Sequence, residues 1–286
     1  YDLKFKEFKN LDYSKSLVDL DMLLSGGPLK DGIPALLNPK FSNIEKSTIK
    51  DDVAGIFVEF GSEQRFYPYT ILVWHEIVND IVAGEKIVVT FCPLCGSAIV
   101  YDRSVDGKVL DFGVSGFLNE SNMVMYDRQT ESFWSQSAGN SIVGDKIGVE
   151  LKILPMQVFS FSQLKEKYPQ ARVLSTDTGY YRDYDLYPYR SYDESDDTIF
   201  PVSVKNKRYF TKEIMYVLPL EDASLSVLNK NLRDGENKFK LDVGTLIIEK
   251  NGGELTAKLN NKFIPGYYEM WFSWATQHEN DGIVLE

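Results

Sequence analysis

The chain is poor in the residues that most often bind metals or carry out thiol chemistry. Among its 286 residues there are two cysteines, Cys92 and Cys95, and two histidines, His75 and His278. The cysteine pair does not decide the redox compartment, because a buried disulfide fits an oxidising space whereas a metal site fits either kind of space. A site with soft ligands must therefore be built around these few positions.

Long apolar runs and an excess of positive charge are also absent. No stretch of about 18 consecutive apolar residues occurs, so the sequence predicts no transmembrane segment. Lys and Arg total 31 against 42 for Asp and Glu, which gives a formal net charge of -11. Because an acidic surface repels phosphate backbones, we expect no nucleic-acid partner.

Several catalytic motifs are missing or incomplete. The chain has no Gly-x-Ser-x-Gly nucleophile turn and no phosphate-binding loop. Asp177-Thr178-Gly179 matches the tripeptide of aspartic proteases, but those enzymes need two carboxylates and no second copy exists, so we interpret it as a turn. In His75-Glu76-Ile77-Val78-Asn79, an asparagine stands where the helix of zinc peptidases has its second histidine, which argues against peptidase chemistry.

The residue pattern predicts an α+β fold that is mainly antiparallel β with a few short helices. The 17 Tyr and 17 Phe, together with many β-branched runs, favour strands. No regular alternation of strands and helices is present, which argues against a parallel α/β sheet. Helices are predicted over residues 69–80, capped by Thr70, and over residues 158–168, capped by Ser160 or Ser162.

Three regions are expected along the chain. Residues 1–25 form an N-terminal arm, residues 26–200 a main domain with the Cys-x-x-Cys and His-Glu motifs, and residues 201–286 a C-terminal β-rich segment that packs on the main domain. The polar, Tyr-rich stretch 177–200 is predicted to be a loop or a boundary. Because the chain begins at Tyr1 rather than at a methionine, we expect a processed or trimmed form.

The most informative motif is Cys92-Pro93-Leu94-Cys95-Gly96. It directly follows the β-branched run Ile87–Phe91, and the residues from Ser97 onward have a strand pattern instead of the pattern of a helix start. Two strands joined by a short Cys loop form a metal knuckle, in which the glycine lets the backbone turn and direct its amides at sulfur. The motif therefore predicts a knuckle and not the helix-opening pair of thioredoxin-like enzymes.

The first interpretation of this knuckle is a soft-metal site. Cys92 and Cys95 supply two ligands, and His75 is the best candidate for a third. A thioether ligand in addition would favour copper, and without one zinc fits equally well. Glu76 would be the available base if the metal activated a water molecule.

Two other interpretations remain open. The pair can serve a thiol–disulfide oxidoreductase with Cys92 as nucleophile, which requires a low thiol pKa and an accessible sulfur. Alternatively, Cys92 and Cys95 form a disulfide that only stabilises a non-enzymatic structural or binding module. His75, in turn, can be a buried histidine that bonds a backbone carbonyl.

Four further polar residues are candidates for the site or its support. On the predicted helix, Asn79 shares a face with His75, and Asp80 lies on the next face. Asp127 and Arg128 stand at the end of a predicted hairpin, where they can form buried ion pairs. For these last two a structural role is the stronger interpretation.

The order of the motifs resembles one family, the extracytoplasmic bacterial and archaeal proteins of the domain of unknown function 3179 family. The resemblance extends over roughly residues 26–275. It rests on Asp31-Gly32-Ile33-Pro34-Ala35, His75-Glu76-Ile77-Val78-Asn79-Asp80, Thr90-Phe91-Cys92-Pro93-Leu94-Cys95-Gly96-Ser97-Ala98, Phe112-Gly113-Val114-Ser115-Gly116, Met125-Tyr126-Asp127-Arg128, Trp134-Ser135-Gln136 and Leu174-Ser175-Thr176-Asp177-Thr178-Gly179.

The resemblance implies a location but no reaction. Members of that family resemble secreted or lipid-anchored proteins, so an extracytoplasmic location is implied, with a signal segment removed or a lipid anchor attached. The activity of the family is not established. The site residues above are therefore argued from their own chemistry and not from the family.

Overall fold

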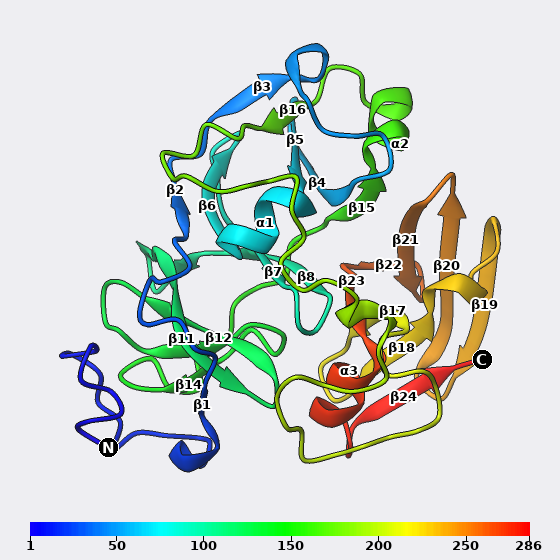
Figure 1. Ribbon diagram of the computed structural model, residues 1–286. Coiled ribbons are helices and arrows are strands. Elements are labelled where there is room, and N and C mark those ends of the chain that lie inside the picture. Colours follow the sequence, from blue (N-terminus) through cyan, green and yellow to red (C-terminus); the bar gives the residue numbers. More distant parts are fainter.

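Strands form most of the secondary structure, which confirms the prediction of a mainly antiparallel α+β fold. The computed structural model describes residues 1–286 and contains four sheets and a two-stranded ribbon (Figure 1). No helix is both long and apolar enough to cross a membrane. The helical elements are α1 (Tyr69–His75), α2 (Phe161–Lys167), α3 (Trp271–Gln277), η1 (Leu20–Met22), η2 (Ile44–Lys46), η3 (Tyr192–Glu194) and η4 (Asn229–Asn231).

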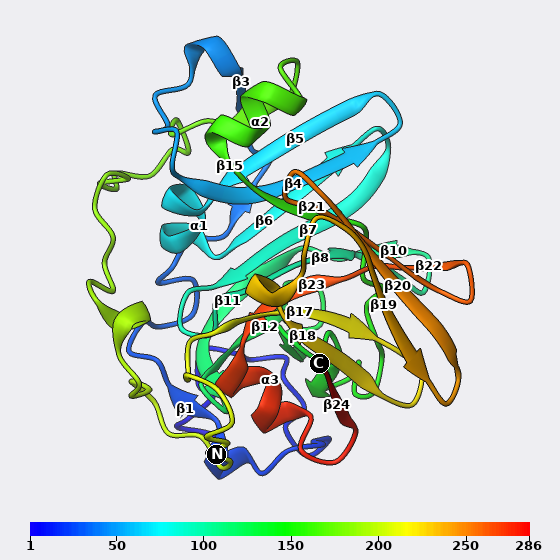
Figure 2. The same ribbon diagram turned by 90° about the vertical axis from the view of Figure 1, so that its right-hand side faces the viewer.

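The largest sheet has eight strands and crosses the middle of the molecule (Figure 2). In spatial order these are β2 (Leu36–Leu37), β6 (Ile77–Val82), β7 (Glu85–Cys92), β8 (Ser97–Asp102), β23 (Tyr267–Met270), β17 (Ile214–Pro219), β18 (Ser224–Leu228) and β24 (Gly282–Leu285). The pairs β2–β6 and β18–β24 are parallel, and the others are antiparallel. A single register pair, Ala98 with Tyr268, joins β8 to β23. Strands from distant parts of the chain therefore meet beside the Cys loop.

A five-stranded sheet lies at the top of the molecule in Figures 1 and 2. In spatial order its strands are β15 (Gln157–Ser160), β4 (Ala54–Phe60), β5 (Glu63–Pro68), β16 (Arg172–Leu174) and β3 (Phe41–Asn43). Helix α2 begins directly after β15 with a capping box, in which Ser160 and Gln163 each bond the other's backbone N–H. This confirms the second predicted helix and Ser160 as its cap.

A second five-stranded sheet holds the N-terminal arm. Its strands are β1 (Leu24–Ser25), β11 (Phe112–Asn119), β12 (Asn122–Asp127), β13 (Phe133–Ser135) and β14 (Ser141–Val143), and the adjoining ribbon is β9 (Ser104–Val105) with β10 (Lys108–Val109). Phe5, Phe8 and Leu11 of the arm are buried in one cluster with Tyr126 and Phe133 of this sheet. The arm is thus anchored by aromatic side chains although residues 1–19 contain no helix or strand.

A four-stranded antiparallel meander completes the fold near the C-terminus. Its strands follow chain order as β19 (Gly235–Leu241), β20 (Gly244–Asn251), β21 (Glu254–Leu259) and β22 (Lys262–Ile264). Leu246, Ile248 and Leu255 belong to the same hydrophobic cluster as the central sheet. Gln157 on β15 also bonds both backbone groups of Leu255, at 2.8 Å and 2.9 Å. The meander is therefore packed against the sheets that precede it.

The predicted helix over residues 69–80 is wrong in its second half. Helix α1 ends at His75, Glu76 has a φ of 58°, and β6 begins at Ile77. The β-branched side chains of the following segment fit a pleated sheet better than a helix, and β6 pairs with β7 along its whole length. His75 and Asn79 consequently lie on different elements and share no helix face.

The predicted cap of this helix is also wrong. The N-cap residue is Pro68, which has a φ of -62° and no side-chain capping bond. Thr70 lies inside the first turn, and its hydroxyl is buried without a hydrogen-bond partner. The strand-ending proline, rather than a capping hydroxyl, therefore marks where the helix starts.

Replacement of Phe8 by alanine should lower the free energy of unfolding by about 3–5 kcal/mol, because it removes a buried ring from the arm. The Phe8 ring is 5% exposed and meets Phe133 edge to face, with centroids 4.7 Å apart. Leu3, which is 88% exposed, gives the control variant Leu3→Ala, for which we expect a change within about 0.5 kcal/mol. Urea denaturation measures both, and equal effects would mean that the arm contributes no packing.

Candidate functional site

The two cysteines lie in a tight turn between neighbouring strands. Cys92 ends β7, Ser97 begins β8, and these two residues form a register pair. Within the turn, the N–H of Cys95 donates to the carbonyl of Cys92 at 3.2 Å. Gly96 has a φ of 56°, and a Cβ there would come within 2.9 Å of Met270. Both the backbone and the available space thus require glycine, and the predicted strand–knuckle–strand geometry is confirmed.

The two sulfurs are buried, close together and chemically unequal. Cys92 and Cys95 are free thiols with 1% and 0% exposure, and the Cys95 thiol donates to the carbonyl of Ser121 at 3.1 Å. Burial acts to raise the pKa of Cys92, but hydrogen bonds from the Cys95 thiol and from the backbone of Met123, Cys95 and Leu94 lower it overall. Burial and the adjacent Cys92 sulfur raise the pKa of Cys95. Cys92 is therefore the sulfur prepared to carry negative charge.

Two buried carboxyl groups lie beside the thiol pair. Burial raises the pKa of Glu269 to about 8 and raises the pKa of Glu76 well above its usual range, and the charge of Cys92 adds to both shifts. Ser273 donates to Oε1 of Glu269 at 2.6 Å, whereas Oε2 is buried without a partner. Against burial, which raises the pKa of Cys95, Ser273 acts to lower it. Cys95, Ser273 and Glu269 are therefore neighbours behind the turn.

The His75 side chain forms its hydrogen bonds with groups other than the cysteines. It is fully buried, its Nδ1 lies 2.7 Å from the carbonyl oxygen of Pro34, and its Nε2 lies 2.7 Å from the hydroxyl of Tyr184. Burial lowers the pKa of His75, so the neutral ring is favoured, with Nδ1–H donating and Nε2 accepting. The Tyr184 hydroxyl lies 2.7 Å from that of Thr178 as well.

The predicted set of three metal ligands is thus not assembled in this structure. No three or more His, Cys, Asp or Glu side chains lie together in a group that could hold a metal ion. The knuckle brings Cys92 and Cys95 together. Glu76, which directly follows His75 in the sequence, lies near Cys92. The occupancy of the pair by zinc or copper stays a prediction.

Asn79 and Asp80 support the sheet. The side chain of Asn79 accepts from the N–H of Phe112 at 2.8 Å and donates to its carbonyl at 2.9 Å, so it joins β6 to β11. Asp80 accepts from the hydroxyl of Tyr67 at 2.6 Å and from the N–H of Ile81 at 2.8 Å. Asn79 therefore connects β6 to β11, Asp80 connects β6 to β5, and neither side chain bonds a cysteine.

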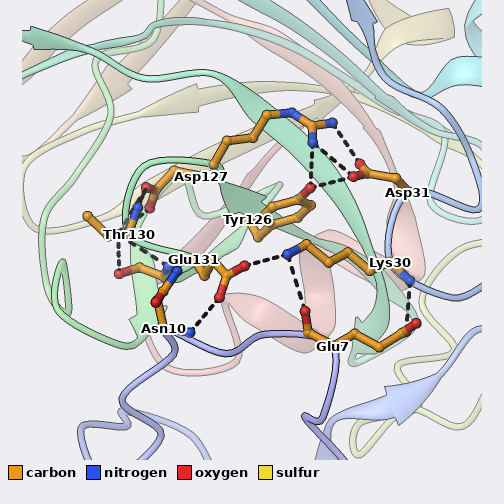
Figure 3. A network of polar contacts seen from close by, with 10 residues as sticks. Glu7, Asn10, Lys30, Asp31, Tyr126, Asp127, Thr130 and Glu131 are labelled. Carbon is orange, nitrogen blue, oxygen red and sulfur yellow. Dashed lines mark hydrogen bonds and ion pairs between the residues drawn. The ribbon is translucent and has the colours of Figure 1, made fainter.

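Asp127 and Arg128 are structural, and each has its own partners. Asp127 is fully buried and accepts from the N–H of Thr130 at 2.6 Å and from Nε1 of Trp134 at 3.0 Å. Arg128 forms a two-pronged ion pair with Asp31, at 2.7 Å and 2.9 Å. Figure 3 shows Asp31 and the contact of Asp127 with Thr130 beside a second group, in which Glu131 contacts Lys30 and the N–H of Asn10. The contacts of Arg128 and Glu131 attach residues 10–31 to the turn that follows β12.

Residues 177–200, the predicted loop, cover the cysteine turn. Tyr192 is buried, and its hydroxyl donates to the carbonyl of Leu94 at 2.9 Å. Burial raises the pKa of Tyr189, and the charges of Glu76 and Cys92 raise it further, which places Tyr189 near both groups. Sequence reasoning gave this segment no role in the site, since its composition indicates only a polar loop.

Glu269 and Ser273 were also missed by sequence reasoning. They come from β23 and α3, far along the chain from the cysteines. The available signal was the isolated acid in the aromatic run Tyr267–Trp274, where an unpaired carboxyl group is costly. No periodicity connects that run with the Cys motif, so the contact follows only from the tertiary fold.

A cleft with a volume of about 920 Å³ opens on the outer side of the cysteine turn. Its lining includes Pro93 and Gly96 of the turn, the stacked rings of Tyr69 and Phe91, and Lys212. The cysteine sulfurs lie behind this wall, because both thiol residues are buried. A ligand in the cleft would therefore contact the turn before it contacted sulfur.

Fold and site together define a β-rich protein with a buried dithiol between two acids. The family described as protein of unknown function (DUF3179) matches residues 30–251, and the chain belongs to that family. This confirms the resemblance found in the motifs. No curated protein and no solved structure matches the chain.

The stability of the protein should fall as the pH rises from about 5 to about 8, because Glu269 keeps a proton in the folded state that the unfolded state has released. One such group contributes a slope of at most about 1.4 kcal/mol per pH unit. Glu269→Gln cannot ionise and should flatten this profile in urea denaturation, whereas the exposed control Glu279→Gln should keep the wild-type slope. A Glu269→Gln profile as steep as that of the wild type would contradict the assignment.

Proposed function

We propose that the chain is a thiol–disulfide oxidoreductase in which Cys92 is the nucleophile and Cys95 the resolving thiol. One observation carries this proposal: two free, buried thiols lie in one tight turn, where the N–H of Cys95 donates to the carbonyl of Cys92 at 3.2 Å. Amides directed at one sulfur stabilise a thiolate there, and a second sulfur within reach can close a disulfide. The unequal pKa shifts of the two thiols support the same assignment of roles.

The proposed reaction transfers two electrons between the cysteine pair and a substrate disulfide. The Cys92 thiolate attacks one sulfur of a substrate disulfide, so that a mixed disulfide forms, the substrate S–S bond breaks, and the leaving thiolate takes a proton. Cys95 then loses its proton and attacks the Cys92 sulfur. This step releases the second substrate thiolate and leaves a Cys92–Cys95 disulfide. The reverse sequence oxidises a substrate dithiol.

Glu269 is the group near Cys95 that can accept the proton of that thiol. Ser273 donates to its Oε1 at 2.6 Å, and its Oε2 is buried without a partner. Because burial raises the pKa of Glu269 to about 8, this carboxyl group is mostly protonated at neutral pH, and only its ionised fraction accepts a proton. We therefore expect the attack by Cys95 to become faster as the pH rises toward 8.

Cys95→Ser should trap the mixed disulfide, because the resolving sulfur is missing and Cys92 cannot be released. Incubation with oxidised glutathione or a disulfide-bonded peptide, followed by mass measurement of the intact protein, should show one adduct per chain. The matched variant Cys92→Ser should show at most a slow adduct on Cys95, whose thiol is the less acidic of the two. Equal amounts of adduct on the two variants, or no adduct on either, would contradict the proposed function.

A second candidate, the soft-metal site predicted from sequence, is favoured by the unpartnered buried oxygen of Glu269. Because no three such side chains are grouped in this structure, zinc or copper on Cys92 and Cys95 could use that carboxylate as a further ligand only after it moved, with Glu76 as a candidate base. His75 could join only by giving up its bond from Tyr184.

Metal content and free thiols on protein purified without chelator or affinity metal separate the candidates. Near-stoichiometric metal that disappears in Cys92→Ser establishes the metal site. Two free thiols without metal support the dithiol. A mass lower by two hydrogens means a disulfide, and its reduction potential then decides between an exchanger and a stabilising crosslink: a potential below about -300 mV indicates the crosslink.

We place this activity outside the cytoplasm. Disulfide exchange as a lasting function suits an oxidising space, and the motif resemblance implies secreted or lipid-anchored relatives. Fractionation of cells that produce the natural protein tests this location. Recovery in the cytoplasmic fraction would contradict this location. In that reducing space the cysteine pair would stay a dithiol.

A further inference from the structure

The segment between β16 and β17 has little structure of its own. From Ser175 to Glu213 it contains only the single turn η3. Figure 2 shows it as a long yellow-green segment without strands that runs along one side of the molecule, outside the sheets. Several of its large side chains face solvent, among them Tyr181 at 99% and Leu186 at 55% exposure. Such a segment opens at a lower free energy cost than the sheets beneath it.

Two attachments fix the first half of this segment. The Tyr184 hydroxyl bonds Nε2 of His75 at 2.7 Å, and Nε1 of Trp74 donates to the carbonyl of Leu186 at 3.3 Å. Both partners lie at the end of α1. His75 is itself held by the carbonyl of Pro34, so it offers Tyr184 a rigid acceptor.

The second half is attached at the cysteine turn itself. Tyr192 donates to the carbonyl of Leu94, inside the Cys-Pro-Leu-Cys loop, and its ring packs in the same hydrophobic cluster as both cysteines. Lys212 lies with its Nζ 4.2 Å from the centre of that ring and donates to the carbonyls of Ser195 and Asp197 at 3.0 Å and 2.8 Å. Lys212 thus closes the segment over Tyr192.

We infer that residues 177–200 form a movable cover over Cys92 and Cys95, held by the Tyr184–His75 and Tyr192–Leu94 bonds, and that its release admits a disulfide substrate to the Cys92 sulfur. This regulation rests on the proposed function of the same site. It accounts for a nucleophile that is 1% exposed, because the sulfur is reached in the open state and not in the closed one. The cleft beside Pro93 is where the substrate would enter.

The cover is tested by alkylation of the reduced protein with N-ethylmaleimide, which needs no disulfide exchange. Wild-type Cys92 should react far more slowly than a free thiol. Tyr192→Phe and Tyr184→Phe each remove one attaching hydroxyl, and a loss of about 1 kcal/mol per bond should raise the rate about fivefold. Tyr181→Phe, in the same segment but almost fully exposed, should leave the rate unchanged.

The dependence on denaturant separates cover opening from unfolding. Release of one segment exposes little surface, so the alkylation rate should rise only weakly with low concentrations of urea. Rates that follow the full slope of global unfolding would overturn the cover, as would equal rates for Tyr192→Phe, Tyr184→Phe and Tyr181→Phe. The two proposals can fail separately. If the alkylation rates change as expected but Cys95→Ser traps no adduct even in the Tyr192→Phe background, the oxidoreductase is refuted and the inferred cover is still supported.

Discussion

The rest of the structure depends on the turn that Gly96 allows between β7 and β8. Its left-handed backbone returns the chain from Cys95 into β8, so both cysteines lie in one tight turn, where the N–H of Cys95 donates to the carbonyl of Cys92 at 3.2 Å. A side chain at this position would collide with Met270. The same close approach lets the N–H of Met270 donate to the carbonyl of Cys95 at 2.8 Å. One glycine therefore fixes both the geometry of the thiols and the docking of β23.

Burial of acidic groups around this turn is a cost that the surrounding fold offsets. Glu76, Glu269 and the two thiols share one apolar region. Burial acts to raise the pKa of each group, which favours its neutral form. The exception is Cys92, where directed hydrogen bonds outweigh burial. A site of this kind concentrates reactivity on one atom while its neighbours stay protonated.

Local sequence was sufficient for what local forces decide. The strands around the Cys motif, the capping box at Ser160 and the fold class could be predicted, because alternation, β-branching and cap chemistry act over a few residues. The helix over residues 69–80 was overextended, since pairing of β6 with β7 overrides an apparent helical period. The bonds of His75 to Pro34 and Tyr184, and the approach of Glu269, join distant segments and leave no trace in residue spacing.

The pairing of β8 with β23 has a consequence for how the protein matures. The acid and the hydroxyl behind Cys95 come from residues 269 and 273, so the thiols acquire their neighbours only after nearly the whole chain is available. Non-local pairing of this kind forms slowly, and until it forms the knuckle is open to oxidants and to other thiols. Maturation in an oxidising space would thus expose a nascent dithiol to pairing with foreign cysteines until β23 docks.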